Sequence, residues 1–147
     1  MKLVYSTLAA TLLSLGSAIA LAAPDAVVDM YKNANCGCCD KWAEHMERNG
    51  FKVRTHVVPD ASAYRKRAGM PATHGSCHTA MVGGYAVEGH VPAADVKRLL
   101  QQRPKAVGIA VPGMPMGSPG MEQGGTKQAY DVLLVKTGGA TEVFASH

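Results

Sequence analysis

Apolar and polar residues recur at strand-like and helix-like spacings along much of the chain. The apolar run at residues 27–31 predicts a short buried strand. Residues 40–49, in which Trp42 and Met46 lie four positions apart, predict a helix that ends at Gly50. The chain therefore begins its folded part with a strand followed by a helix.

Five further elements follow this first pair. They are a second strand, a short helix, two strands joined by a two-residue glycine turn, and a helix opened by proline. They are expected at residues 51–58, 60–67, 77–82, 85–91 and 92–103. This order, with a C-x-x-C sequence at the head of the first helix, is typical of an α/β, thioredoxin-like fold with a mixed central sheet and flanking helices.

The composition changes after Pro104. Residues 112–128 form a loop rich in Met, Gly and Pro, which has no periodicity and cannot be a helix or a central strand. Residues 129–135 and 140–145 predict a terminal hairpin across a Gly-Gly turn. The loop is therefore held at both ends, and long loops of this kind are usually functional or disordered.

The first residues indicate export. Lys2 precedes an apolar stretch at residues 8–21, and Ala20-Leu21-Ala22 is a small-x-small cleavage pattern. The stretch is short for a membrane-spanning helix and no second apolar run follows. We predict a signal peptide at residues 1–22, a single domain at residues 23–147, a soluble periplasmic location and no stable membrane insertion.

The charge of the chain is mild. The whole sequence has 15 basic and 11 acidic residues, a net charge of +4, and loss of Lys2 with the signal leaves +3. This excess is too small to indicate binding to nucleic acid. The remaining residues, about 125, suit one domain with a modest core.

Four cysteines carry the candidate chemistry. Three fall within the sequence Cys36-Gly37-Cys38-Cys39, where the helix dipole favours thiolate over thiol. Cys38 adds a thiol that a simple disulfide exchanger does not need. In thioredoxin-like folds the loop before the third strand faces the C-x-x-C, so Cys77 is expected to close over the cluster. Clustered thiolates select Cu(I), and four of them also suit zinc.

Methionines and histidines supply further candidates. Met114, Met116 and Met121 lie in the Gly/Pro loop rather than at helical spacing, and thioethers are soft ligands for Cu(I). Among the histidines, the weaker candidates are His74 and His90. We expect His56 on the polar side of its strand and His78 pointing away from Cys77, so that both are surface residues.

Two other classes of function compete with a copper site. A thiol–disulfide oxidoreductase would use Cys36 as nucleophile and Cys39 as resolving cysteine, acting on protein disulfides. A binding module stapled by two disulfides would make all four cysteines structural.

The motifs also resemble a known family. The sequences Asn35-Cys36-Gly37-Cys38-Cys39, Ser76-Cys77-His78-Thr79-Ala80, Glu88-Gly89-His90-Val91-Pro92 and the Pro/Gly/Met loop are similar to those of periplasmic copper-resistance proteins of the CopG type. The resemblance covers nearly the whole mature chain. It implies a thioredoxin-like fold, a thiolate-bound, multinuclear Cu(I) cluster, and copper redox activity. By this similarity Cys36, Cys38, Cys39 and Cys77 are copper ligands, the methionine loop lies close by, and other periplasmic copper-handling proteins are expected partners.

Overall fold

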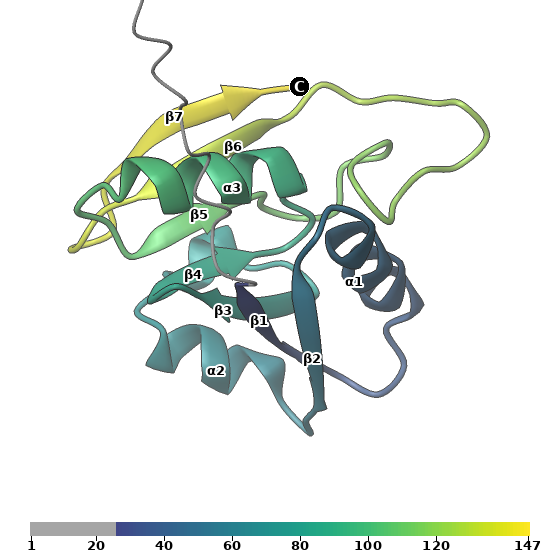
Figure 1. Cartoon of the computed structure of the whole chain (residues 1–147), viewed down its shortest axis with the longest axis horizontal. Coiled ribbons are helices and arrows are strands. Elements are labelled where there is room, and N and C mark those ends of the chain that lie inside the picture. The colour runs from purple at the N-terminus through teal and green to yellow at the C-terminus, as the bar shows by residue number, and fades with distance from the viewer. Residues whose placement is uncertain (1–25) are drawn as a thin grey trace, which may run out of the picture.

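A computed structural model describes residues 26–147, so the predicted signal peptide at residues 1–22 lies outside the described residues (Figure 1). Seven strands form one sheet. They are β1 Val27–Lys32, β2 Lys52–Val57, β3 His78–Val82, β4 Tyr85–Glu88, β5 Gly108–Ala110, β6 Asp131–Val135 and β7 Thr141–Ser146. The helices are α1 Gly37–Arg48, α2 Ala61–Arg67 and α3 Ala93–Gln102, with a 3-10 turn at Ala72–His74.

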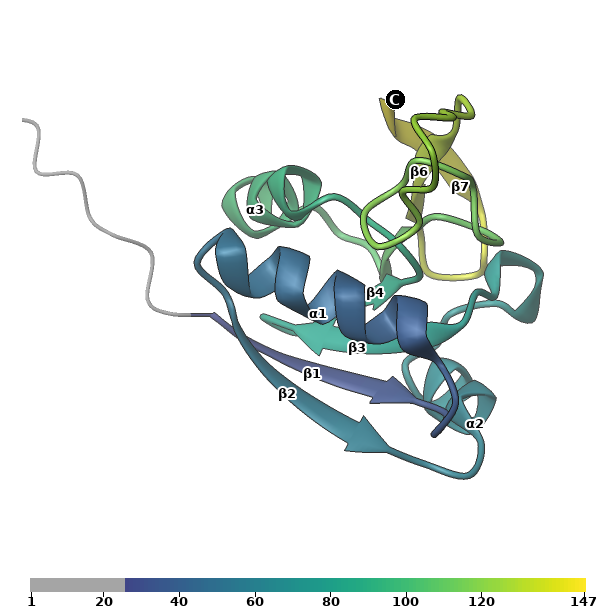
Figure 2. The same ribbon diagram turned by 90° about the vertical axis from the view of Figure 1, so that its right-hand side faces the viewer.

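The sheet has the order β2-β1-β3-β4-β5-β6-β7. β1 pairs with β2 in parallel and with β3 antiparallel, and β3 pairs antiparallel with β4. Helices α1 and α3 lie on one face of this four-strand unit and α2 lies on the other (Figure 2). The predicted thioredoxin-like fold is confirmed, including the two-residue turn between β3 and β4.

The larger core fills the space between the sheet and α1 and α3. Val28 and Met30 from β1 meet Trp42 and Met46 from α1, and all four are fully buried, as is Leu99 from α3. Apolar burial of this kind is the main source of stability in a domain of this size. In addition, the Trp42 indole N–H donates to the carbonyl oxygen of Val91 at 2.9 Å, which ties α1 to the junction of β4 and α3.

Strand β5 is the element that the sequence pattern does not predict. Its three residues pair in parallel with β4 and antiparallel with β6, so it joins the predicted terminal hairpin to the main sheet. Three residues are too few to show an alternating pattern. The first, Gly108, has no room for a side chain, because a Cβ atom there would overlap the carbonyl oxygen of Ala86.

His45 on α1 accepts a hydrogen bond from the backbone N–H of Ala93, the first residue of α3, at 3.0 Å from its Nε2. This bond satisfies one of the free N–H groups at the start of that helix. Burial lowers the pKa of His45, and the charge of Arg48 lowers it further. The neutral imidazole is therefore part of the contact between the two helices.

We predict that acid weakens this contact. Below the ordinary histidine pKa of 6.5, the unfolded chain takes up a proton at His45 that the folded chain does not. The free energy of unfolding therefore falls as the pH drops from 7 toward the lowered pKa of the folded state. In His45→Gln, whose amide oxygen can still accept from Ala93, urea unfolding should show a shallower loss of stability between pH 7 and 5.

The control is the same pair of proteins between pH 8 and 9, where His45 is neutral in both states and the two pH dependences should be equal. Equal slopes at acidic pH as well would contradict the prediction.

Candidate metal centre

Three of the cysteines lie at the start of α1. Cys36 occupies the position just before the helix, and Cys38 and Cys39 lie in its first turn, since α1 begins at Gly37 rather than near Asp40 as expected. Cys39 is fully buried, while Cys36 and Cys38 are partly exposed. Free N–H groups at this helix end favour negative charge, which suits thiolates.

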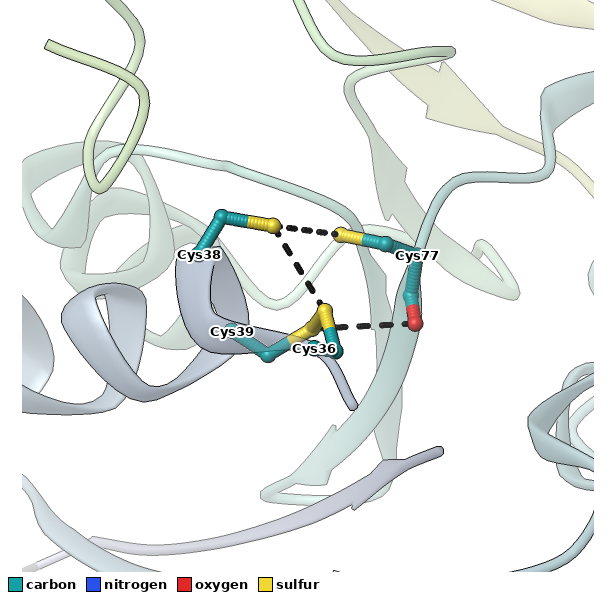
Figure 3. A group of neighbouring side chains, drawn as sticks. All are labelled: Cys36, Cys38, Cys39 and Cys77. Atoms are coloured by element: carbon teal, nitrogen blue, oxygen red, sulfur yellow. Dashed lines mark hydrogen bonds between the residues drawn. A yellow bond between two sulfur atoms is a disulfide. The ribbon is translucent and has the colours of Figure 1, made fainter. Parts of the chain in front are cut away.

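Cys77 approaches this group from the other side of the site, immediately before β3 (Figure 3). Its Sγ atom lies 3.7 Å from Sγ of Cys38, which in turn lies 3.5 Å from Sγ of Cys36. All four sulfur atoms lie within 4.8 Å of one another. The structure thus brings together the four cysteines that the sequence predicts to form one site, although they come from two distant segments.

Cys36 and Cys39 are joined as a disulfide in this structure, whereas Cys38 and Cys77 are free thiols. The structure therefore shows the half-oxidised site, in which two sulfurs are free and two are covalently joined. Reduction of this single bond would make all four sulfurs available as ligands. The alternative in which two disulfides staple the domain does not match this pairing.

His78 overturns one expectation from the sequence. It is completely buried instead of exposed, and its Nδ1 lies 3.6 Å from Sγ of Cys77 instead of pointing away. The expectation was wrong because side chains alternate only inside a strand, and Cys77 precedes the first residue of β3. His78 pairs with Lys32 of β1 and packs against the Trp42 ring at 4.4 Å between centroids, so it faces α1.

His90 is the second buried imidazole at the site. Its Nε2 lies 2.9 Å from Sγ of Cys77, and its Nδ1 lies 2.8 Å from the carbonyl oxygen of Pro119. Because a carbonyl can only accept, Nδ1 carries the proton, and Nε2 is left with a lone pair directed toward Cys77. His90 was one of two weak candidates in the sequence. The other, His74, lies in the 3-10 turn and belongs to neither group of potential ligands.

The pKa directions show which donors are neutral. Burial lowers the pKa of His78 well below its ordinary value, with the charges of His90 and Lys32 adding to the effect, and burial also lowers the pKa of His90. Burial, and next the charge of Cys38, raise the pKa of the Cys77 thiol to about 12. A metal ion binding to Cys77 must therefore displace a proton, whereas the two imidazoles are ready to act as ligands.

A buried positive charge lies beneath the helix head. Lys32 is only 3% exposed, and its Nζ donates to the carbonyl oxygen of Cys36 at 3.2 Å and forms an ion pair with Asp40. A thiolate site around a monovalent ion carries excess negative charge. Because Asp40 already balances the charge of Lys32, the free N–H groups at the start of α1 are what offset negative charge on the sulfurs.

The methionine loop, residues 112–128, also contacts the site through residues in its middle. Gly120 packs so closely on α1 that a Cβ atom there would lie 2.8 Å from the carbonyl oxygen of Cys38 and 2.9 Å from the backbone nitrogen of Trp42. Pro119 holds His90 through its carbonyl oxygen. The loop residues Pro115 and Ser118 are also buried.

The three loop methionines differ in whether they line the cavity beside the thiols. Met114, which is 52% exposed, lines an open cavity of about 710 Å³ together with Cys36, Cys38 and Cys77. Met116 and Met121 do not line this cavity. Only Met114 of the three is thus placed by the structure at the mouth of the site.

The donor set fits a soft metal ion. The potential ligands fall into two groups that share Cys77, one of four cysteines and one made of Cys77, His78 and His90, and neither group contains a carboxylate. Hard cations prefer oxygen, whereas thiolate and imidazole bind Cu(I) or zinc. Of the two His78 ring nitrogens, Nδ1 lies toward Cys77, while the buried Nε2 has no hydrogen-bond partner among the described residues.

Fold and site together define a thioredoxin-like protein with clustered cysteines and histidines that could hold a soft metal ion. A model of the family described as "Protein of unknown function, DUF411" matches residues 74–121. Two solved structures, copper resistance protein CopG in form 2 and form 1, are each 50% identical to this chain. The matches cover 83% and 82% of this chain, and 98% and 96% of the chains in the form 2 and form 1 structures. The TM-scores are 0.79 and 0.78.

The chain belongs to the CopG family of copper-resistance proteins. No match was found among curated proteins. Within residues 26–147 no helix is both long and apolar enough to cross a membrane.

We predict that Gly120→Ala loosens the loop from α1. Gly120 has φ +85°, which costs a residue with a Cβ atom about 1–2 kcal/mol, and the new Cβ would also collide with backbone atoms that cannot move aside. Overpacking of this kind adds about 1–3 kcal/mol. Urea unfolding of the metal-free protein should show a loss of about 2–5 kcal/mol in the free energy of unfolding.

Gly124→Ala is the matched control, because Gly124 also has a positive φ, +57°, but no atom lies within 4 Å of its Cβ position. An equal loss in both variants would show that the contact of Gly120 with α1 contributes nothing.

Proposed function

We propose that this protein binds Cu(I) in the periplasm, after removal of an N-terminal signal peptide, and thereby contributes to copper resistance. The ligands are Cys36, Cys38, Cys39 and Cys77, with Met114 at the open side. The observation that carries the proposal is the convergence of four sulfur atoms from two distant segments to within 4.8 Å of one another. The CopG names of the two similar structures point to the same metal.

Several features of the site support a copper cargo over a zinc one. Zinc sites of the structural type are closed by four ligands. Here the sulfur group adjoins a second group with two buried imidazoles, and an exposed methionine thioether lies at the cavity. Thioethers are ligands for Cu(I) rather than for zinc. The number of donors suits more than one copper ion, and Met116 and Met121 remain candidate ligands from the loop.

The Cys36 and Cys39 pair also suggests how copper redox chemistry is coupled to the site. In the reduced protein the two thiols can give one electron each to two Cu(II) ions. The products are two Cu(I) ions, one Cys36–Cys39 disulfide and two released protons, so electrons and protons balance. In this state Cys38 and Cys77 remain free and, with the imidazoles, can retain Cu(I). Other periplasmic copper-handling proteins would exchange copper or electrons at the open cavity.

We predict that single substitutions at the site lower copper binding. The mature chain, reduced and loaded anaerobically, is titrated against a chromophoric Cu(I) chelator. Cys38→Ser and Cys77→Ser should each weaken Cu(I) affinity by more than about 100-fold, and His90→Gln by about tenfold or more, since even groups that only support ligands have effects of about 10–100-fold.

His74→Gln is the matched control for His90→Gln, because His74 lies outside both ligand groups. Circular dichroism of each metal-free variant separates loss of ligand from loss of fold. A reduced wild-type protein that takes up no Cu(I), or that binds zinc in preference to it, would overturn the proposal.

One observation favours the oxidoreductase as a second candidate function. Cys36 and Cys39 form the disulfide of a C-x-x-C pair, and Cys36 borders the open cavity, as a nucleophilic cysteine must. This activity needs neither Cys38 nor Cys77. It is therefore separable from copper binding by mutation.

We predict that a Cys38→Ser, Cys77→Ser double variant distinguishes the two functions. If the protein is a copper-binding protein, the double variant loses Cu(I) and neither it nor the wild type reduces insulin disulfides in the presence of glutathione. Insulin reduction that persists in the double variant at the wild-type rate would instead establish the oxidoreductase.

A further inference from the structure

A buried ion pair is hydrogen-bonded to Ser76, the residue before Cys77. Arg65 of α2 and Glu88, the last residue of β4, meet with Nε of the guanidinium 2.8 Å from Oε1 of the carboxylate. The Glu88 side chain is fully buried, and that of Arg65 is only 12% exposed. Charged side chains are rarely placed so deep in a protein unless they are paired. Arg65 also lines the open cavity that Cys38 and Cys77 line.

The pair holds both backbone groups of Ser76, the residue before Cys77. The Ser76 N–H donates to Oε1 of Glu88 at 2.7 Å, and Nη2 of Arg65 donates to the Ser76 carbonyl oxygen at 2.8 Å. The second carboxylate oxygen of Glu88 accepts from the Thr79 hydroxyl at 2.6 Å. The ion pair is thus bonded on both sides of Cys77 in the sequence.

Two glycines make room for this arrangement. A Cβ atom on Gly75 would lie 3.0 Å from the Arg65 guanidinium. One on Gly89, which follows Glu88, would lie 2.7 Å from Cβ of Ser76. The Ser76 hydroxyl in turn donates to the carbonyl oxygen of Gly113, the residue before Met114. The same contacts therefore also fix the base of the methionine loop.

Stability alone does not explain the pair. The cost of removing two charges from water often exceeds their attraction, so a buried ion pair can be replaced by neutral groups of similar volume with little loss. What such a pair provides is a fixed geometry for the groups bonded to it. In thioredoxin-like folds a proline normally stands in this loop, whereas here the sequence before β3 is Gly75-Ser76-Cys77.

We propose that the Arg65–Glu88 ion pair positions Cys77 opposite Cys38 and fixes the base of the methionine loop. The role of Cys77 as a copper ligand rests on the proposed function. Neither residue is a ligand. Both act through Ser76, and their effect is on the separation of the two sulfur atoms.

The test uses an Arg65→Met, Glu88→Gln double variant, which removes both charges together and leaves no unpaired buried ion. The control is Arg54→Met, Asp29→Asn, which removes a more exposed bidentate ion pair between β1 and β2 that does not touch the loop before β3. Cu(I) affinity should fall about 10–100-fold in the first variant and stay within about twofold in the control. Arg65→Lys alone keeps the positive charge but not the planar set of guanidinium donors, so it should lose less Cu(I) affinity than the double variant.

A second readout needs no metal. In a Cys36→Ala, Cys39→Ala background, the equilibrium between the Cys38–Cys77 dithiol and its disulfide in a glutathione buffer gives the effective concentration of one thiol at the other. We expect the Arg65→Met, Glu88→Gln change to lower this concentration by about tenfold or more. Unfolding in urea is measured on the same proteins, because a purely structural role would change stability without changing this concentration.

The outcomes are separable. An unchanged effective concentration and an unchanged Cu(I) affinity would overturn the positioning role. A wild-type protein that binds no Cu(I) would overturn the proposed function, and the glutathione equilibrium would still decide the positioning role. If the double variant does not fold, Gly75→Ala takes its place in both measurements. Its Cβ atom would press on the Arg65 guanidinium and on the carbonyl oxygen of Ala72, each at 3.0 Å, without removing a charge.

Discussion

The antiparallel pairing of β1 with β3 is the constraint on which the site depends. Lys32, the last residue of β1, lies opposite His78, the first residue of β3. The segment that follows β1 and the segment that precedes β3 therefore meet at the same end of the sheet. The first contains Cys36 and the second contains Cys77. A register slip of one residue would turn His78 to the other face and move Cys77 away from the helix head. The hydrogen bonds of two central strands thus bring the cysteine segments together.

Much of this arrangement could be predicted from the sequence, because the elements that carry it have strong local signals. The helix with Trp42 and Met46 and the glycine turn of the β3–β4 hairpin are examples. The positions of His78 and His90 could not be predicted. His78 is buried because α1 covers its face of the sheet, and His90 is fixed by a carbonyl of the distant loop. Both depend on tertiary packing, which the spacing of residues along one element does not report.

The pairing of the cysteines also could not be predicted from the sequence. Four cysteines allow three ways to form two disulfides, and composition does not choose among them. In the structure Cys39 is buried under the helix head and is joined to Cys36, while the extra thiol of Cys38 faces Cys77. The motif therefore combines a C-x-x-C pair, able to exchange electrons, with a separate pair of thiols that stays free. This division explains why a metal site and a thiol–disulfide exchanger are both natural interpretations of the same sequence.

The bond from the Trp42 indole to the carbonyl oxygen of Val91 joins two parts of the donor set. Trp42 lies in the helix that carries three cysteines, and Val91 follows His90. Sulfur and nitrogen donors on different elements are therefore held at a fixed separation before any ion arrives. Little conformational entropy remains to be lost on binding, which favours tight retention. Under the proposed function, an ion at this open cavity would leave by stepwise replacement of its donors by those of an acceptor, without unfolding of the domain.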